Sequence, residues 1–162
     1  MNEKALTDLA QAVVEKLKAD NKTLGLAESC TGGWLSKLIT DVSGASSVYN
    51  GGICSYSNQV KMSLLGVKPE TLNTYGAVSE QTAYEMANGA RKVLGSDIGV
   101  GITGIAGPLS DNTSKPVGLI YVAVANGEKT IVKELRNKFT DDIRNNNRLS
   151  ALKTALTLLG DI

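Results

Sequence analysis

The stretch Ala27-Glu28-Ser29-Cys30-Thr31-Gly32-Gly33-Trp34 decides the fold, because the hydrophobic pattern changes from that of a strand to that of a helix across it. The apolar segment 23–28 has the length of a strand. Beyond the turn, apolar residues recur at helical spacing, at Trp34, Leu35, Leu38, Ile39 and Val42. Paired glycines let the backbone approach a bound group, and free N–H groups at a helix N-terminus favour negative charge. The octapeptide therefore predicts a turn that presents the Ser29 hydroxyl beside donors for an oxyanion.

Two other interpretations of this turn are open at the level of sequence. Ser and Thr are ordinary helix N-caps, and paired glycines are ordinary turn residues. Cys30 is a rival nucleophile directly beside Ser29. Alternation along the chain would point Cys30 into the core, where a buried thiol is inert.

Composition describes a single soluble globular domain over residues 1–162, with 42% hydrophobic and 20% charged residues. A net charge of +1 predicts no general attraction to nucleic acid or membrane, and no apolar run approaches the ~20 residues of a membrane span. The N-terminus lacks a signal-peptide pattern. The two cysteines, Cys30 and Cys54, form no CxxC motif, so we expect reduced thiols in a cytoplasmic protein.

The chain contains no histidine. This absence excludes a Ser-His-Asp triad, a Cys-His dyad and every histidine-ligated metal site. Two cysteines far apart in sequence also argue against a thiolate metal site, so we expect neither a metal nor a cofactor. A hydrolase with this sequence would need Lys, a carboxylate or Tyr as its base.

The whole pattern predicts an α/β fold, a three-layer α/β/α domain with a mixed sheet. The apolar run 117–125 predicts a strand covered on both faces, and Asn126-Gly127 predicts a hairpin after it. Gly51-Gly52 predicts a bulge in an earlier strand. Helices are expected over residues 3–20, 34–42, 58–65, 69–75, 79–94 and 141–159, and strands over 23–28, 48–57, 98–103, 117–125 and 129–138.

Gly99, Gly101 and Gly104 match a GxGxxG pattern, but they lie inside a predicted strand, and Gly107-Pro108 follows in place of a helix. We therefore reject a dinucleotide site. The loop that begins with Thr103 and Gly104 offers a hydroxyl and backbone amides at a strand end, where ligand-binding walls often form. An ordinary connecting loop fits this segment equally well.

Basic residues in two predicted helices are candidates for a base and for an anion site. Lys61 lies in a mostly apolar helix, and such surroundings would lower its pKa and let it accept a proton. Ser-Lys pairs are known substitutes for Ser-His pairs. Arg144 and Arg148 lie one helical turn apart and share a face that suits a phosphate or carboxylate. Solvated surface charge is the alternative for these residues, and for Arg148 more than for Arg144.

Five ordered motifs together resemble the CinA C-terminal domain family: AESCTGG, YSNxxK from Tyr56 to Lys61, GAVSE from Gly76 to Glu80, TGIAGP and KPVG. The resemblance covers residues 5–160, and stand-alone members of the family are similar to nicotinamide mononucleotide deamidases of the PncC type. It implies an amidohydrolase that converts nicotinamide mononucleotide and water into nicotinic acid mononucleotide and ammonia. It also implies that Ser29 is the nucleophile and Lys61 its base.

On this resemblance, Tyr56 would orient Lys61 or bond to Ser29, and Arg144 would bind the ribose phosphate together with the loop. A pyridine mononucleotide would be the small-molecule partner, and a dimer or larger homo-oligomer is expected. The predicted substrate-binding residues are Cys30, Thr31, Gly32, Gly33, Thr103, Gly104 and Arg144.

Two segments depart from the family pattern. The loop after GIAGP usually carries a Gly-Gly pair, whereas this chain has Leu109-Ser110-Asp111-Asn112. A Gly-Asp-Arg stretch before the last helix is replaced by Thr140-Asp141-Asp142-Ile143-Arg144, with the arginine displaced by one position. These departures favour one alternative, a nucleotide-phosphate-binding or regulatory module without turnover. A hydrolase of another small amide is a further alternative, which the sequence does not distinguish.

Overall fold

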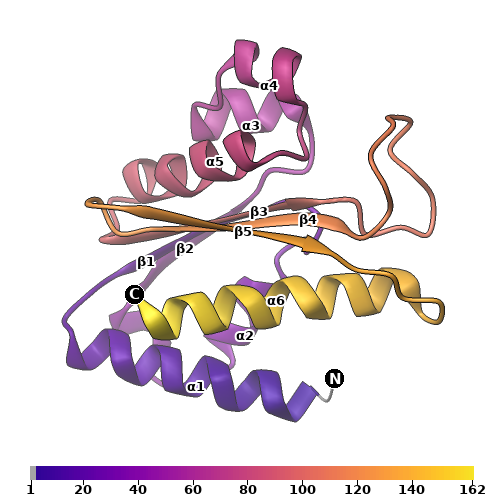
Figure 1. Ribbon diagram of the computed structural model, residues 1–162. Coiled ribbons are helices and arrows are strands. Elements are labelled where there is room, and N and C mark those ends of the chain that lie inside the picture. Colours follow the sequence, from indigo (N-terminus) through magenta and orange to yellow (C-terminus); the bar gives the residue numbers. More distant parts are fainter. Residues whose placement is uncertain (1–2) are drawn as a thin grey trace.

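The computed structural model describes residues 3–162 and shows a five-stranded sheet between two layers of helices (Figure 1). Across the sheet the strands are β2 (Tyr49–Cys54), β1 (Leu24–Glu28), β3 (Ile98–Gly104), β4 (Leu119–Ala125) and β5 (Thr130–Arg136). Neighbouring strands are parallel at β2–β1 and β1–β3 and antiparallel at β3–β4 and β4–β5. The predicted three-layer α/β fold with a mixed sheet is therefore confirmed.

One helical layer is formed by the two ends of the chain and the other by its middle (Figure 1). One face of the sheet is covered by α1 (Glu3–Ala19), α2 (Trp34–Thr40) and α6 (Ile143–Asp161), with a short 3-10 turn at Ala45–Ser47. The other face is covered by α3 (Asn58–Leu65), α4 (Pro69–Tyr75) and α5 (Glu80–Val93). Within residues 3–162, no helix has both the length and the hydropathy that crossing a bilayer requires.

Strand β4 is buried on both faces, as its nearly continuous apolar sequence predicts. Ile120 and Val122 belong to the larger core, which the sheet forms with α1, α2 and α6. Ala123 points to the opposite layer, where it clusters with Ala83 and Ala87 of α5. Small residues on this second face allow α5 to lie close to the sheet.

The glycines of the GxGxxG pattern serve this close packing. A Cβ atom at Gly99 would lie 2.1 Å from the carbonyl oxygen of Ala87, and one at Gly101 would lie 2.5 Å from that of Ala83. Both distances are far below van der Waals contact, so the backbone of α5 occupies the space that side chains on β3 would need. The pattern therefore accommodates a helix, which agrees with the rejection of a dinucleotide site.

The packing makes Gly99→Ala strongly destabilising. We expect the free energy of unfolding to fall by about 3 kcal/mol, because a methyl group must push α5 away from β3. Gly160→Ala is the matched control, since a Cβ there meets nothing within 4 Å and Ala is the better helix former. Urea unfolding of both variants measures the difference. Equal stability of the two variants would contradict this account of the packing.

Candidate active site

Ser29 and Lys61 are brought together by the parallel pairing of β1 and β2. Ser29 follows the last residue of β1, and its N–H donates to the carbonyl of Ile102 in β3 (3.0 Å). Residues 55–57 connect β2 to α3, and the Ser57 hydroxyl accepts from the N–H of Val60 (3.2 Å) and caps the helix. The carboxyl ends of parallel neighbours meet at one edge of the sheet. As a result, Nζ of Lys61 lies 3.1 Å from Oγ of Ser29.

Lys61 is an unusually buried lysine, with 1% of its surface exposed. Its Nζ donates to the carbonyl of Ser55 (2.6 Å) and lies 3.4 Å from that of Tyr56. Burial lowers its pKa from 10.5 to about 8, against a smaller opposite effect of Cys30. About a tenth of the amines are then neutral at pH 7. A neutral amine has two N–H groups for the two carbonyls and a lone pair for the Ser29 hydroxyl, which is the arrangement a general base needs.

The lowered pKa predicts a difference in stability between wild type and Lys61→Met that depends on pH. The unfolded chain keeps the ordinary pKa of 10.5, so between pH 8 and 10.5 it binds a proton that the folded chain lacks. Raising the pH through this window therefore stabilises the wild type relative to Lys61→Met, by roughly 2–3 kcal/mol. Urea unfolding at pH 7.5 and pH 10 measures the effect. The control Lys92→Met, which removes an exposed lysine, should keep the wild-type dependence; the same dependence in Lys61→Met would refute the prediction.

Glu28 organises the turn between β1 and α2, and sequence reasoning missed it. Its carboxylate is 1% exposed and accepts from the N–H groups of Gly33 (3.2 Å), Leu35 (3.0 Å) and Ser36 (2.8 Å), and from the Ser36 hydroxyl (2.9 Å). These are the N–H groups that a helix start leaves without a partner. The signal was an acidic residue at the end of a fully buried strand, directly before a helix. Glu28 therefore neutralises the N-terminus of α2, which was expected to stabilise an oxyanion.

Glu28→Gln tests this capping role. A carboxamide has a single acceptor oxygen, so the N–H groups on one side of Glu28 would face a donor instead of an acceptor. We expect the free energy of unfolding to fall by about 2 kcal/mol in urea titrations. Glu70→Gln, at an exposed position in the first turn of α4, is the control and should change stability little. Equal effects of both substitutions would show that the Glu28 carboxylate has no special role.

The N–H groups of residues 30–33 were predicted to stabilise an oxyanion, but two of these four groups are already bonded within the turn. The N–H of Gly32 donates to the carbonyl of Ser29 (3.0 Å), and that of Gly33 donates to Glu28. Within residues 3–162, the N–H groups of Cys30 and Thr31 donate to no other residue, and that of Cys30 lies near its own thiol. These two N–H groups directly follow Ser29 in the chain and, among residues 30–33, are the ones that bind no other residue of the turn.

Cys30 has the properties of a buried structural thiol. It is 6% exposed and belongs to the larger core, as alternation along the chain predicts. Burial raises its pKa from 9.0 to about 12, so the thiol stays protonated at neutral pH. These properties argue against Cys30 and in favour of Ser29 as the nucleophile.

Tyr56 and Arg144 meet at the rim of the site. The guanidinium of Arg144 donates to the carbonyl of Gly107 (3.0 Å) and to the hydroxyl of Tyr56 (3.2 Å). The Tyr56 side chain is 65% exposed, and it is the backbone carbonyl of this residue, not its hydroxyl, that faces Lys61. Tyr56 therefore contacts Lys61 through its backbone carbonyl, and its hydroxyl bonds to Arg144 and not to Ser29.

Thr103 and Gly104, which were predicted to bind substrate, make contacts that hold the fold together. The Thr103 side chain is 1% exposed, and its hydroxyl donates to the carbonyl of Ala77 (2.7 Å). A Cβ at Gly104 would lie 2.6 Å from the Ile120 side chain, so this glycine allows β3 and β4 to approach. To donate to a substrate, the Thr103 hydroxyl would have to give up its bond to Ala77.

Arg148 lies against the turn and not in bulk solvent. It is half-buried, and its Nε and Nη2 donate to the carbonyls of Cys30 (3.1 Å) and Thr31 (2.8 Å). The expectation that Arg148 is the more surface-like of the two arginines is therefore wrong. Spacing alone indicated a shared face with Arg144 and gave no sign of the carbonyls that Arg148 contacts.

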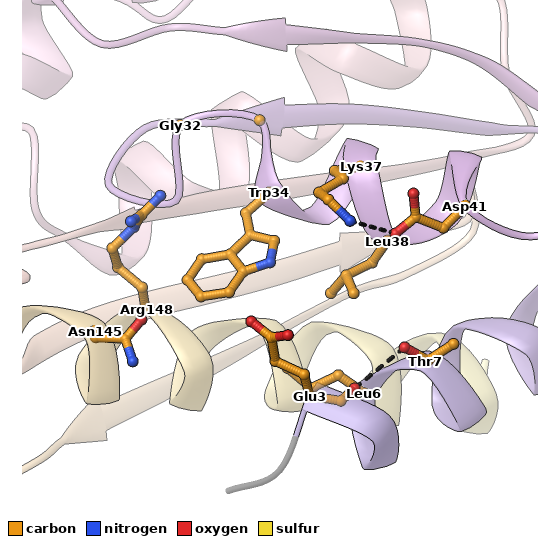
Figure 2. Close-up of a pocket in the computed structure, with 11 residues that line it drawn as sticks. Glu3, Leu6, Thr7, Gly32, Trp34, Lys37, Leu38, Asp41, Asn145 and Arg148 are labelled. Atoms are coloured by element: carbon orange, nitrogen blue, oxygen red, sulfur yellow. Dashed lines mark hydrogen bonds and ion pairs between the residues drawn. The ribbon is translucent and has the colours of Figure 1, made fainter.

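A cavity of about 600 Å³ lies beside Arg148, in the layer of α1, α2 and α6 (Figure 2). Its walls include Gly32 in the turn, Trp34 at the start of α2 and Asn145 on α6. Ser29 and Lys61 do not line it. Within residues 3–162, no group of three or more Cys, Asp or Glu side chains is placed to hold a metal ion.

Comparison with known proteins places the chain in one family. The family model described as the CinA C-terminal domain matches residues 6–162. A CinA-like protein from Syntrophomonas wolfei is 48% identical over 151 residues, which cover 93% of this chain and 36% of that protein. The crystal structure of a competence/damage inducible protein from Agrobacterium tumefaciens has 37% identity and a TM-score of 0.89, covering 95% of this chain and 93% of that one.

A CinA superfamily protein from Escherichia coli has 31% identity and a TM-score of 0.91, with 100% of this chain and 93% of that chain covered. A relative from Acetivibrio thermocellus, whose name includes the words "competence-damage inducible protein", is 58% identical over 125 residues. That match covers 76% of this chain and 30% of the relative, so the chain spans about a third of the length of the curated relatives it matches. The chain belongs to the CinA C-terminal domain family.

Proposed function

We propose that the chain is an amidohydrolase that converts nicotinamide mononucleotide and water into nicotinic acid mononucleotide and ammonia. The observation that carries the proposal is the contact of 3.1 Å between Ser29 Oγ and the buried Nζ of Lys61. A lysine with a pKa of about 8 is a competent base near neutral pH, and the chain has no histidine to take this role. The choice of substrate rests on the resemblance to stand-alone members of the family.

In the acylation half of the reaction, neutral Lys61 takes the proton of the Ser29 hydroxyl while Oγ attacks the carboxamide carbon. The C=O π electrons move to oxygen, and the resulting oxyanion accepts from the N–H groups of Cys30 and Thr31. When the C–N bond breaks, protonated Lys61 gives its proton to the departing nitrogen. Ammonia leaves, Ser29 carries the nicotinoyl ester, and Lys61 is neutral again.

In the deacylation half, neutral Lys61 takes a proton from water while the water oxygen attacks the ester carbon. The same two N–H groups stabilise the second oxyanion. Collapse of this intermediate breaks the bond to Oγ, and Lys61 returns its proton to Ser29. The product carboxylic acid then ionises. The positive pyridinium ring of the substrate makes its carboxamide electrophilic, which favours both attacks.

Arg144 is the residue best placed to attract the substrate phosphate. Its guanidinium is exposed, and its contacts are to two neutral oxygens, those of Gly107 and Tyr56. Within the described residues it takes part in no ion pair, so its positive charge is available to an anion. Its bond to Tyr56 places this charge beside the segment that leads into α3 and Lys61.

The proposal predicts that ammonia release from nicotinamide mononucleotide requires both Ser29 and Lys61. Ser29→Ala and Lys61→Met should each lower kcat by at least about 1,000-fold, whereas Lys92→Met should not change it. In the wild type, kcat should rise with pH and level off above about pH 8, because the base must be unprotonated. Near-wild-type turnover by either variant would overturn the Ser-Lys mechanism. Binding of the mononucleotide without ammonia release would instead select a non-catalytic module.

A further inference from the structure

The guanidinium of Arg148 joins α6 to the turn that follows Ser29. Two of its nitrogens donate to successive carbonyls, those of Cys30 and Thr31, and its central carbon lies 4.9 Å from the centroid of the Trp34 ring. Figure 2 shows the side chain rising from α6 to the turn beside Trp34. A planar guanidinium can make this paired contact and stack at the same time, which a lysine ammonium cannot do.

The peptide between Cys30 and Thr31 is trans, so its C=O and N–H groups point in opposite directions. Because Arg148 binds this C=O from the side of α6, the N–H of Thr31 points away from α6. That N–H has no acceptor among the described residues. The next C=O, that of Thr31, is also bound to Arg148, while the N–H of its peptide, on Gly32, closes the turn onto Ser29. Arg148 therefore fixes the plane of each peptide that follows Cys30 and Thr31.

The positive charge of Arg148 also favours an anion near the turn that its hydrogen bonds hold in place. Arg148 takes part in no ion pair within residues 3–162, so no carboxylate neutralises it there. Burial is the main influence on the pKa of the Cys30 thiol and raises it, whereas the charge of Arg148 lowers it. The same charge that favours an anion at Cys30 favours an oxyanion beside the Cys30 and Thr31 N–H groups. Hydrogen bonds to a carbonyl also polarise its peptide and strengthen the N–H as a donor.

We propose that Arg148 is a positioning residue of the active site, which aims and polarises the Thr31 N–H as a donor to the reaction's oxyanion. This inference rests on the proposed amidohydrolase function and adds to it a residue that contacts neither Ser29 nor Lys61. Loss of Arg148 leaves the base and nucleophile in place but frees the peptide plane. The loss should therefore appear in kcat and much less in KM.

The cavity beside Arg148 makes a chemical rescue experiment possible. Gly32, Trp34 and Arg148 all line this space of about 600 Å³ (Figure 2). If Arg148 is truncated to Ala, free guanidinium can enter the cavity and donate to the two carbonyls. A residue needed for folding alone would not be replaced in this way.

The experiment compares wild type, Arg148→Ala, Arg148→Lys and Lys153→Met. Lys153 is an exposed cation on the same helix and serves as the control for the loss of charge. Ammonia release from nicotinamide mononucleotide gives kcat and KM, with and without guanidinium chloride at a few millimolar and with sodium chloride as the salt control. The rate of Ser29 sulfonylation by phenylmethanesulfonyl fluoride, measured by mass spectrometry, reports on the turn without amide turnover. Thermal unfolding shows that each variant is folded.

We expect Arg148→Ala to lower kcat by about 30- to 100-fold with KM changed less than about 3-fold, and Arg148→Lys to lie between it and the wild type. Guanidinium should restore kcat several-fold in Arg148→Ala alone. A folded Arg148→Ala with wild-type kcat, or a loss that guanidinium does not restore, overturns the inference. A wild type that reacts at Ser29 but releases no ammonia refutes the proposed substrate, and the sulfonylation rates then decide on Arg148. A wild type inactive in both assays overturns the two together.

Discussion

The contact between the buried amine of Lys61 and the hydroxyl of Ser29 is the interaction on which the rest of the site depends. A buried ammonium is costly unless a carboxylate pairs with it, and Lys61 has carbonyl oxygens and a hydroxyl as its partners instead. The fold therefore favours the neutral amine and sacrifices stability near neutral pH to keep it. Parallel pairing of β1 with β2 is what makes the contact possible, because one strand leads into Ser29 and the other into the helix of Lys61.

Two charged side chains of opposite sign hold the turn between these strands and α2. Glu28 binds N–H groups of the turn and of α2, and Arg148 binds carbonyls of the turn. Among residues 3–162, this leaves the N–H groups of Cys30 and Thr31 with no acceptor on another residue. An anion at this turn would thus be stabilised by two individual N–H groups and a nearby guanidinium. The dipole of α2 contributes less, because a carboxylate already occupies its end.

The layers, the strands and the pairing of Ser29 with Lys61 could be predicted from the sequence. The other hydrogen bonds of the site could not. Hydrophobic periodicity was sufficient for β4 and for the helices, because burial on one or both faces is written into the spacing of apolar residues. The absence of histidine and the apolar surroundings of Lys61 pointed to a lysine base. The position of Arg148 and the bond between Arg144 and Tyr56 depend on contacts between residues 118 and 88 positions apart, which no local pattern encodes. The bonds of Glu28 span only 5 to 8 residues, but an acidic residue before a helix does not by itself show that its carboxylate folds back onto the turn.

A direct titration of the Lys61 amine tests the central claim most sharply. Lysine labelled with ¹³C at Cε gives a resonance that shifts as Nζ loses its proton, and comparison with Lys61→Met assigns the signal. The account predicts a midpoint near pH 8, well below the other lysines, because burial disfavours the charged amine. A midpoint at or above the ordinary value of 10.5 would show that Lys61 stays charged in the folded chain and cannot be the base for Ser29.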